Sequence, residues 1–318
     1  MTGTMKAATW RPGSHMMETV ETARPDPAKG DILVQIKVAG INEMDVETRK
    51  GGWAKQVKQF RKSGPAVTGF EFAGIAVSDG KDIKAGTPVF GYSPVLNGPR
   101  VHAEYAAVPE SCLAPVPDRL GMADAAALIV MGLTAIEVID DIAGIGAEDT
   151  VCVLGAAGGL GAYATQLANA RGAAVTAIAS ETNRDFVLAQ GATVFRSRSE
   201  EPFRADDRFS LILDCPAKLS FAHSRKHLRP GGHYVSSNPL NDLSGFARAA
   251  FSRRRAGWLL MLSTTPEKIN RLSHVTKAGD MRAGIDSIYE FGDINEALDR
   301  FATPGKQGRV LINVGSEA

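Results

Sequence analysis

Short apolar runs broken by glycine and proline dominate the first third of the chain. Four of these runs have the length and composition of β-strands, and turn-forming clusters such as ARPDPAKGD and SDGKDIKAG separate them. They lie at residues 6–10, 32–38, 72–77 and 87–92. The region from about residue 5 to residue 117 is therefore predicted to form a compact, β-rich unit with few helices.

Helical and strand-like segments alternate after residue 117. Segments 123–128 and 133–142 have helical patterns, and unbroken apolar runs then alternate with helical stretches such as 162–170, 183–190 and 221–228. Six runs are predicted as strands: one that begins at residue 151, and those at 174–179, 193–195, 211–213, 234–236 and 258–262. Apolar strands linked by helices indicate a doubly wound parallel sheet that is covered on both faces.

The last part of the chain returns to a mixed pattern. It contains a helix at 267–276, a strand at 285–291, a helix at 294–301 and a closing strand at 309–314. These elements exceed what a six-stranded nucleotide-binding domain requires. The C-terminal segment is therefore expected to fold back onto the first unit, which leaves the nucleotide-binding domain as an insert.

The stretch VCVLGAAGGLG at residues 151–161 carries the most specific chemistry. An apolar strand stops at Gly155, and more glycines follow before a helical pattern begins. Such a turn lets the backbone approach a pyrophosphate, which the N-terminus of the following helix attracts. A dinucleotide is therefore expected to contact Ala157, Gly158, Gly159 and Leu160. The alternative is an ordinary tight turn between a strand and a helix.

Composition and charge narrow the class of protein. The chain has 44% hydrophobic and 22% charged residues, and 36 basic residues against 35 acidic ones give a formal net charge of +1. This balance gives no long-range attraction to nucleic acid or to an anionic membrane. No segment is expected to reach the roughly 20 apolar residues that a membrane span needs, and the first residues show no signal-peptide core. A cytoplasmic location is therefore expected. The three cysteines are too far apart for a disulfide framework.

Several motifs in the same order resemble the medium-chain dehydrogenase/reductase superfamily, and within it the zinc-independent, quinone oxidoreductase-like branch. They are AGINEMDVETRKG, AEYAAVP, GLTA, GAAGGLG and GKQGRVLINV. The resemblance implies a GroES-like catalytic domain at 1–122, a Rossmann domain at 123–265 and a return to the catalytic domain at 266–318. It also implies an active site in the cleft between the two domains and a homodimer.

The zinc ligands of related dehydrogenases are replaced here. Zinc-dependent relatives place a cysteine after the AGI-type strand and a histidine in a GHE motif, because a catalytic zinc ion needs thiolate and imidazole ligands. Asn42 and Phe70 stand at those positions, and a metal-free site is expected. Glu71, where this branch usually has an aspartate, is interpreted as a supporting or structural acid. His223 and His227 have a spacing that can hold a metal, but no third ligand is near.

The resemblance places the acceptor beside Asn42, Asp45 and Trp53. Asn42 would contact the cofactor ribose or a substrate carbonyl, and Trp53 would form an aromatic wall. Each residue also has a structural interpretation: a loop-capping amide for Asn42, a residue in the first turn of a helix for Asp45, and core packing for Trp53.

The end of the second Rossmann strand bears on the choice of cofactor. An NAD-dependent enzyme usually presents an acid there, whereas Ser180 and Arg184 suit the 2′-phosphate of NADPH. Glu181, one position further on, could serve NADH instead, and Arg184 could be a solvent-facing helix residue. Thr134 in GLTA and Asn238 after the fifth strand are expected to line the nicotinamide side of the pocket.

These features predict a zinc-independent, NADPH-dependent oxidoreductase that transfers a hydride to a quinone or an α,β-unsaturated carbonyl. Two alternatives remain open. One is an enoyl reductase or tailoring enzyme of a biosynthetic pathway, which would share the fold and the mechanism. The other is a regulatory protein that binds NADPH without catalysis.

Overall fold

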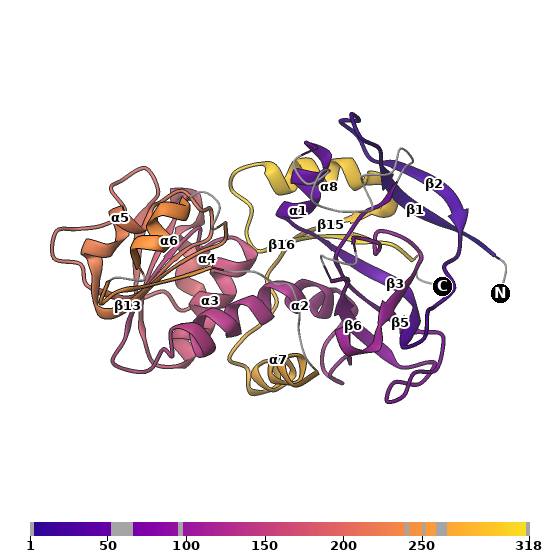
Figure 1. Cartoon of the computed structure of the whole chain (residues 1–318), viewed down its shortest axis with the longest axis horizontal. Helices are drawn as coiled ribbons and strands as arrows, with labels where there is room; N and C mark the ends of the chain where they lie inside the picture. The colour runs from indigo at the N-terminus through magenta and orange to yellow at the C-terminus, as the bar shows by residue number, and fades with distance from the viewer. Residues whose placement is uncertain are drawn as a thin grey trace. The chain divides into compact units, whose positions relative to one another are not determined.

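The computed structural model describes residues 3–51, 66–94, 98–238, 242–249, 252–258 and 266–315. The chain divides into two compact units (Figure 1). One comprises Met1–Val130, Met261–Lys277 and Ala283–Ala318, and the other comprises Met131–Leu260 and Ala278–Arg282. The chain thus leaves the first unit, builds the second and returns. The first crossing between these compact units lies after Val130, inside a helix, and the predicted domain boundary between residues 122 and 123 stays a prediction.

The inserted unit is built on one parallel sheet. In the described part of the chain this sheet has six strands: β9 (Thr150–Leu154), β10 (Ala174–Ala179), β11 (Val194–Ser197), β12 (Phe209–Asp214), β13 (Leu228–Ser236) and β14 (Arg255–Trp258). Their order is β11-β10-β9-β12-β13-β14. This is the Rossmann order, in which the direction of winding reverses between β9 and β12. The predicted doubly wound sheet is confirmed.

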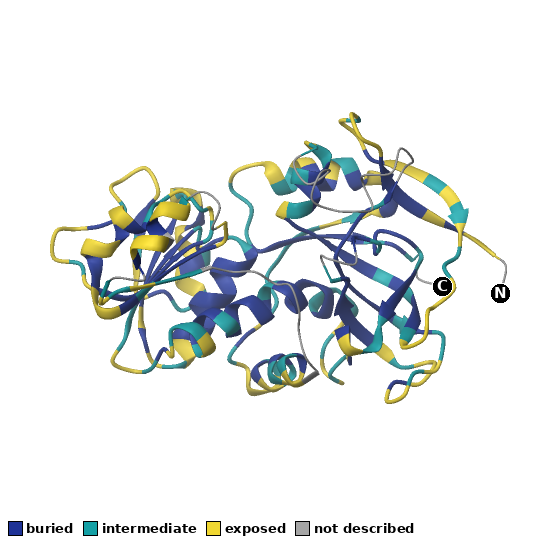
Figure 2. Ribbon diagram, in the orientation of Figure 1, coloured by how far each residue is buried: buried dark blue, intermediate teal, exposed yellow. Residues whose placement is uncertain are grey.

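Among the described residues, four helices cover this sheet: α3 (Gly159–Ala170), α4 (Arg184–Ala189), α5 (Phe221–Ser224) and α6 (Leu243–Ala249). Helices α3 and α4 pack against β9, β10 and β11, and α5 and α6 pack against β13 and β14. Because crossovers between parallel strands are right-handed, helices before and after the reversal cover opposite faces. The central strands β9, β10 and β12 are therefore almost entirely buried, as the dark blue of Figure 2 shows.

Two details of the sheet differ from the sequence prediction. The sixth strand covers Arg255–Trp258, whereas the apolar run at 258–262 is predicted as the strand; residues 259–265 lie outside the described part. The RPGG turn lies within β13, where the pairing with β12 shifts register between Phe209 and Leu211. Glycine and proline mark bulges as well as turns, so composition alone does not separate the two.

One long helical stretch precedes the sheet. α2 (Met122–Ile136) continues directly into a π-helical segment (Glu137–Ile142), where the sequence predicts two helices. Its 21 residues are apolar enough to cross a membrane, so the expectation that no segment approaches that length is wrong. The most apolar window of this helix is 72% buried inside the protein, as in the core helix of a globular domain.

The first unit contains, among its described residues, two sheets, the start of α2 and three further α-helices. Its elements are β1 (Thr4–Trp10), β2 (Glu18–Ala23), β3 (Asp31–Ile41), α1 (Glu43–Arg49), β4 (Ala66–Val67), β5 (Glu71–Ala76), β6 (Pro88–Tyr92), β7 (Tyr105–Pro109), β8 (Leu113–Pro115), α7 (Pro266–Ala278), β15 (Ile285–Glu290), α8 (Ile294–Ala302) and β16 (Arg309–Asn313). The larger sheet has the order β15-β16-β3-β5-β6-β8, with β7 also paired to β3, and the smaller has the order β2-β1-β4.

Strand β3 organises the larger sheet. It pairs with β7 near its start, with β5 in its middle and with β16 over its last four residues. Because β16 comes from the end of the chain, the predicted return of the C-terminal segment is confirmed. The sequence prediction misses strand β2, whose residues are mostly exposed, whereas α1 corresponds to the structural interpretation of Asp45 as a residue in the first turn of a helix.

Candidate active site

The glycine-rich turn joins β9 directly to α3. Gly155 has a φ of +73°, which residues with a side chain rarely adopt. The N–H of Gly158 donates to Gly155 O at 3.0 Å, and Gly158 is the N-cap of α3. Within the described residues no side chain caps this helix. The N–H groups of Gly159, Leu160 and Gly161 therefore have no acceptor inside the helix and can bind an anion.

Packing explains some of these glycines without any ligand. A Cβ atom on Gly161 would lie 2.3 Å from Gly155 O, which is closer than atoms can approach. A Cβ atom on Gly158 would meet that oxygen at an ordinary 3.5 Å. The side chains of Ala157 and Leu160 are buried, so only their backbone could serve a dinucleotide. An ordinary tight turn therefore accounts for Gly155 and Gly161 and leaves Gly158 unexplained.

Asp214, which the sequence prediction omits, holds the neighbouring strand end. It is the last residue of β12, pairs with Leu154 in the sheet and is fully buried. Its Oδ2 accepts hydrogen bonds from the backbone N–H of Leu219 at 2.7 Å and from the Tyr234 hydroxyl at 3.0 Å. Burial raises the pKa of Asp214, although these donors oppose the rise. In the sequence, Asp214 could be singled out as the acid that ends the apolar run LILD.

The loop after Asp214 lies against the glycine turn. The N–H of Cys215 donates to Leu154 O at 3.3 Å, and Pro216 lies 3.1 Å from where a Cβ of Gly155 would be. Both loops stand at the carboxyl ends of β9 and β12, where the winding reverses and Rossmann domains bind their ligands. Asn238 follows β13 at the same edge and is exposed. Thr134 is buried in α2, and its contact with a nicotinamide stays a prediction.

Ser180, Glu181 and Arg184 lie just beyond β10. Arg184 Nε donates to Glu181 Oε1 at 2.8 Å, and the guanidinium lies 4.4 Å from the centre of the Phe195 ring. Both charged side chains are about half exposed. The two residues that favour different cofactors are thus each other's partners, and an incoming phosphate would compete with Glu181 for Arg184.

A buried polar cluster stands in the first unit, where β3 ends. Asn42 is the N-cap of α1 and is 2% exposed. Its Oδ1 accepts from the N–H of Met44 at 2.9 Å, and its Nδ2 donates to Glu71 Oε1 at 3.2 Å. The structural interpretation of Asn42 as a capping amide is therefore observed, and one hydrogen of the Nδ2 group remains for another partner.

Asp45 completes a capping box with Asn42. Its Oδ2 accepts from the backbone N–H of Asn42 at 3.0 Å. Asp45 is 0% exposed, and burial raises its pKa to about 7, although the nearby N–H groups of Asn42 and Gly69 and the charge of Arg309 lower it. Such an acid supports the helix start and does not touch solvent in this structure.

Glu71 and Arg309 form a fully buried ion pair within the same cluster. Arg309 Nη2 donates to Glu71 Oε1, the oxygen that also accepts from Asn42. Burial raises the pKa of Glu71, and the guanidinium opposes the rise. His102 lies beside them with its Nε2 3.1 Å from Gly40 O and its Nδ1 3.0 Å from Thr68 Oγ1. Burial lowers the pKa of His102 to about 4, so its ring is neutral at pH 7.

Comparisons with known proteins identify the family. The alcohol dehydrogenase GroES-like domain matches residues 28–118, and the zinc-binding dehydrogenase family matches residues 190–312. A chloroplast envelope quinone oxidoreductase homolog from Arabidopsis thaliana is 25% identical, with 94% of each chain covered. The chain belongs to the medium-chain dehydrogenase/reductase superfamily and is quinone oxidoreductase-like. It is thus an oxidoreductase of a nicotinamide-dependent family.

Other superfamily members resemble it over most of their length. A 2-methylene-furan-3-one reductase from Solanum lycopersicum is 28% identical, covering 92% of this chain and 74% of the relative. A trans-enoyl reductase from Aspergillus terreus is 26% identical, covering 91% of this chain and 89% of the relative. The structure of the quinone oxidoreductase from Coxiella burnetii has a TM-score of 0.89 over 98% of this chain and all of that chain, with 24% identity, and shows the same fold.

The family's zinc ion does not fit the donors around Asn42. The cluster offers the Asn42 amide, the Asp45 carboxylate that accepts from Asn42 N–H, the Glu71 carboxylate held by Arg309, and the His102 imidazole, whose ring nitrogens both have partners. A catalytic zinc site needs three thiolate, imidazole or carboxylate ligands that are free to bind. Among the described residues no group of three such side chains could hold a metal, and His227 stacks on Phe203. The expectation of a metal-free enzyme stays a prediction.

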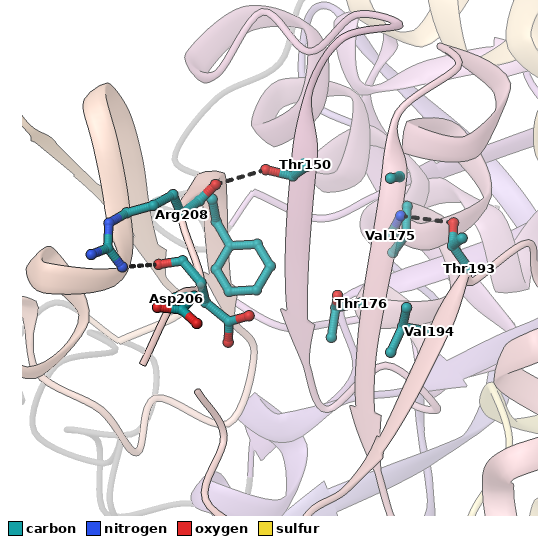
Figure 3. A pocket seen from close by; sticks show the side chains of 10 residues that line it. Thr150, Val175, Thr176, Thr193, Val194, Asp206 and Arg208 are labelled. Carbon is teal, nitrogen blue, oxygen red and sulfur yellow. Dashed lines mark hydrogen bonds between the residues drawn. The ribbon is translucent and has the colours of Figure 1, made fainter. Parts of the chain in front are cut away.

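Two further features fall outside this site. Trp53 lies outside the described residues, so its role as an aromatic wall stays a prediction. A shallow hollow of about 290 Å³ lies at the amino ends of the Rossmann strands, where Thr150 Oγ1 donates to Arg208 O and Val175 N–H donates to Thr193 Oγ1 (Figure 3). The glycine turn is at the opposite ends of these strands, so the hollow is not the dinucleotide site.

Proposed function

We propose that this protein reduces a quinone or an α,β-unsaturated carbonyl with NADPH and without zinc. The observation that carries the proposal is the donor set at the end of β3: a capping amide, Asn42, backed by the Glu71–Arg309 ion pair. The similarity to a quinone oxidoreductase homolog and to a 2-methylene-furan-3-one reductase supports the acceptor class.

Such acceptors do not need a strong Lewis acid. When bound, NADPH would supply a hydride from C4 of its nicotinamide, and the anion formed from the acceptor would take its proton from solvent or a nearby acid. A hydrogen bond to the acceptor oxygen is enough to favour the developing negative charge there. The free N–H of the Asn42 amide is the donor that we assign to this oxygen. Asp45, whose Oδ2 accepts from the backbone N–H of Asn42, would hold Asn42 at the start of α1.

The Rossmann unit would hold the dinucleotide. The free N–H groups at the start of α3 would bind its pyrophosphate, and the Asp214 loop would support the glycine turn from the side. Arg184 and Ser180 would bind the 2′-phosphate of NADPH, with Arg184 exchanging Glu181 for the more highly charged phosphate.

A turnover assay tests the proposed function. Purified protein is mixed with NADPH and a panel of quinones and enones, and cofactor oxidation is followed together with cofactor binding. Oxidation that depends on the acceptor is expected for at least one class. Tight binding of NADPH with no oxidation above background for any acceptor would instead favour the non-catalytic, regulatory alternative.

The enoyl reductase alternative is separated by the same panel. The likeness to a trans-enoyl reductase from Aspergillus terreus favours including enoyl thioesters. A kcat/KM for enoyl thioesters well above that for free quinones and enones would move the assignment to that class, because the pocket and not the fold selects the acceptor.

A further inference from the structure

The Glu71–Arg309 pair joins segments that are far apart in the chain. Glu71 begins β5, Arg309 begins β16, and the two residues are separated by 238 positions. The side chains are 0% and 2% exposed. The free energy needed to remove two charges from water offsets much of their mutual attraction. A protein with an apolar pair of similar volume at such a position is often at least as stable. Stability alone is therefore a weak reason for this chain to contain the pair.

The backbone of β3 makes room for the pair. A Cβ atom on Gly40 would lie 2.7 Å from Glu71 Cγ and 3.0 Å from Arg309 Nη2. Only glycine at this position lets both charged side chains pass beside β3, two residues before Asn42. The pair is thus built into the strand that delivers Asn42.

The contacts of Glu71 converge on a single oxygen. Its Oε1 accepts from both Asn42 and Arg309, while within the described residues its Oε2 has no hydrogen-bond partner. The Asn42 amide is thereby held at both ends, by the Met44 N–H on Oδ1 and by Glu71 on Nδ2. Its plane cannot turn without breaking one of these bonds, and its second Nδ2 hydrogen has one fixed direction.

We propose that Glu71, itself oriented by Arg309, is a positioning residue that fixes the amide of Asn42 for hydrogen bonding to the acceptor. The inference rests on the proposed function, because it takes Asn42 as the contact. It assigns to the ion pair a role in orienting a neutral donor, which explains why the carboxylate faces Asn42 and the guanidinium stands behind it.

Two matched double variants test this role. Glu71→Leu/Arg309→Met removes both charges together, so no unpaired charge is left buried, and it also removes the acceptor for Asn42 Nδ2. Glu71→Gln/Arg309→Met removes the same charges but keeps an amide oxygen for Asn42. The first is expected to lower kcat about tenfold or more because the donor is misplaced, and the second to restore most of that loss. The Kd for NADPH should stay unchanged in both.

Asn42→Ser separates this inference from the proposed function. Serine keeps the helix cap but lacks the amide donor. If Asn42→Ser keeps the wild-type kcat, the proposed contact of Asn42 is wrong. If Asn42→Ser is impaired while folded Glu71→Leu/Arg309→Met keeps the wild-type kcat, the positioning role alone is wrong. Combining the two sets of substitutions should cost no more than Asn42→Ser alone, since both act through one amide.

A single variant covers the case in which the leucine–methionine protein does not fold. Glu71→Asp keeps a carboxylate for Arg309 and withdraws it from Asn42 by one methylene group. It is expected to fold and to lose kcat with little change in the KM for NADPH. A folded Glu71→Asp protein with the wild-type kcat would overturn the proposal.

Discussion

Asp45 and Asn42 hold each other at the start of α1. The Asp45 carboxylate accepts the backbone N–H of Asn42 at 3.0 Å, while the Asn42 side chain accepts the N–H of Met44. Arg309 and Glu71 approach the same pair from β16 and β5, and the N–H of Gly69 approaches from the segment before β5. Asn42 is therefore both the N-cap of α1 and the proposed contact with the acceptor, so substitutions of Asp45 should affect both roles.

Asp45 should make stability depend on pH. Its pKa of about 7 in the folded protein exceeds the value near 4 of an unfolded chain, so the folded state binds an extra proton between these values. The stability from this group is complete below about pH 4 and is lost as the pH rises through 7.

Asp45→Asn should remove that dependence. Between pH 5 and pH 8 the free energy of unfolding of the wild-type protein should fall by about 2–3 kcal/mol relative to the variant. Denaturant unfolding of both proteins at several pH values measures the difference. Parallel curves would show that Asp45 does not hold the extra proton.

Arg184 should select the cofactor. Arg184→Gln should raise the Kd for NADPH by about tenfold or more and change that for NADH little, because only NADPH has the 2′-phosphate. Arg225→Gln, at an exposed position of the same unit, is the control. Glu181→Gln removes the carboxylate that pairs with the Arg184 guanidinium, so it should not weaken NADPH binding. Weaker NADH binding in Glu181→Gln, with NADPH unaffected by Arg184→Gln, would indicate an NADH enzyme.

Two glycines of the turn should respond differently to alanine. Gly161→Ala forces a Cβ atom to within 2.3 Å of Gly155 O and should cost about 1–3 kcal/mol of stability, the range for overpacking. Gly158→Ala meets only an ordinary 3.5 Å contact, so the fold should tolerate it while NADPH binding weakens. Thermal unfolding and cofactor titration separate the effects. Equal affinity in Gly158→Ala and wild type would remove Gly158 from the proposed site.

Asp214 should support the dinucleotide site indirectly. Asp214→Asn exchanges an acceptor for a donor next to the Leu219 N–H and the Tyr234 hydroxyl, and it should cost about 1–3 kcal/mol. Tyr234→Phe removes one donor only and should cost less. Because the loop of Asp214 lies on Gly155, the Kd for NADPH should rise in Asp214→Asn; an unchanged Kd in a destabilised variant would confine Asp214 to folding.

Local patterns in the sequence predict the parts of this protein that depend on near neighbours. The apolar runs and the glycine turn give the Rossmann strands, and the final strand is missed by a few residues because apolar side chains continue past Trp258. The Glu71–Arg309 pair and the role of Asp214 depend on strands brought together by the fold, across 238 positions in the first case. No local pattern reveals such contacts. Asn42 shows the intermediate case: the sequence offers both a cap and a contact, and the structure shows the cap.

Transfer of deuterium from the cofactor to an enone tests the central claim most directly. Protein freed of metal by a chelator, with its zinc content measured, is incubated with an enone and with NADPH carrying deuterium at C4, using each face in turn. One deuterium on the β-carbon of the reduced product, from one face only and without zinc, is the predicted result. Two results would contradict it. One is a protein that binds NADPH but transfers no deuterium to any enone and reduces no quinone, and the other is deuterium transfer that occurs only after zinc is added.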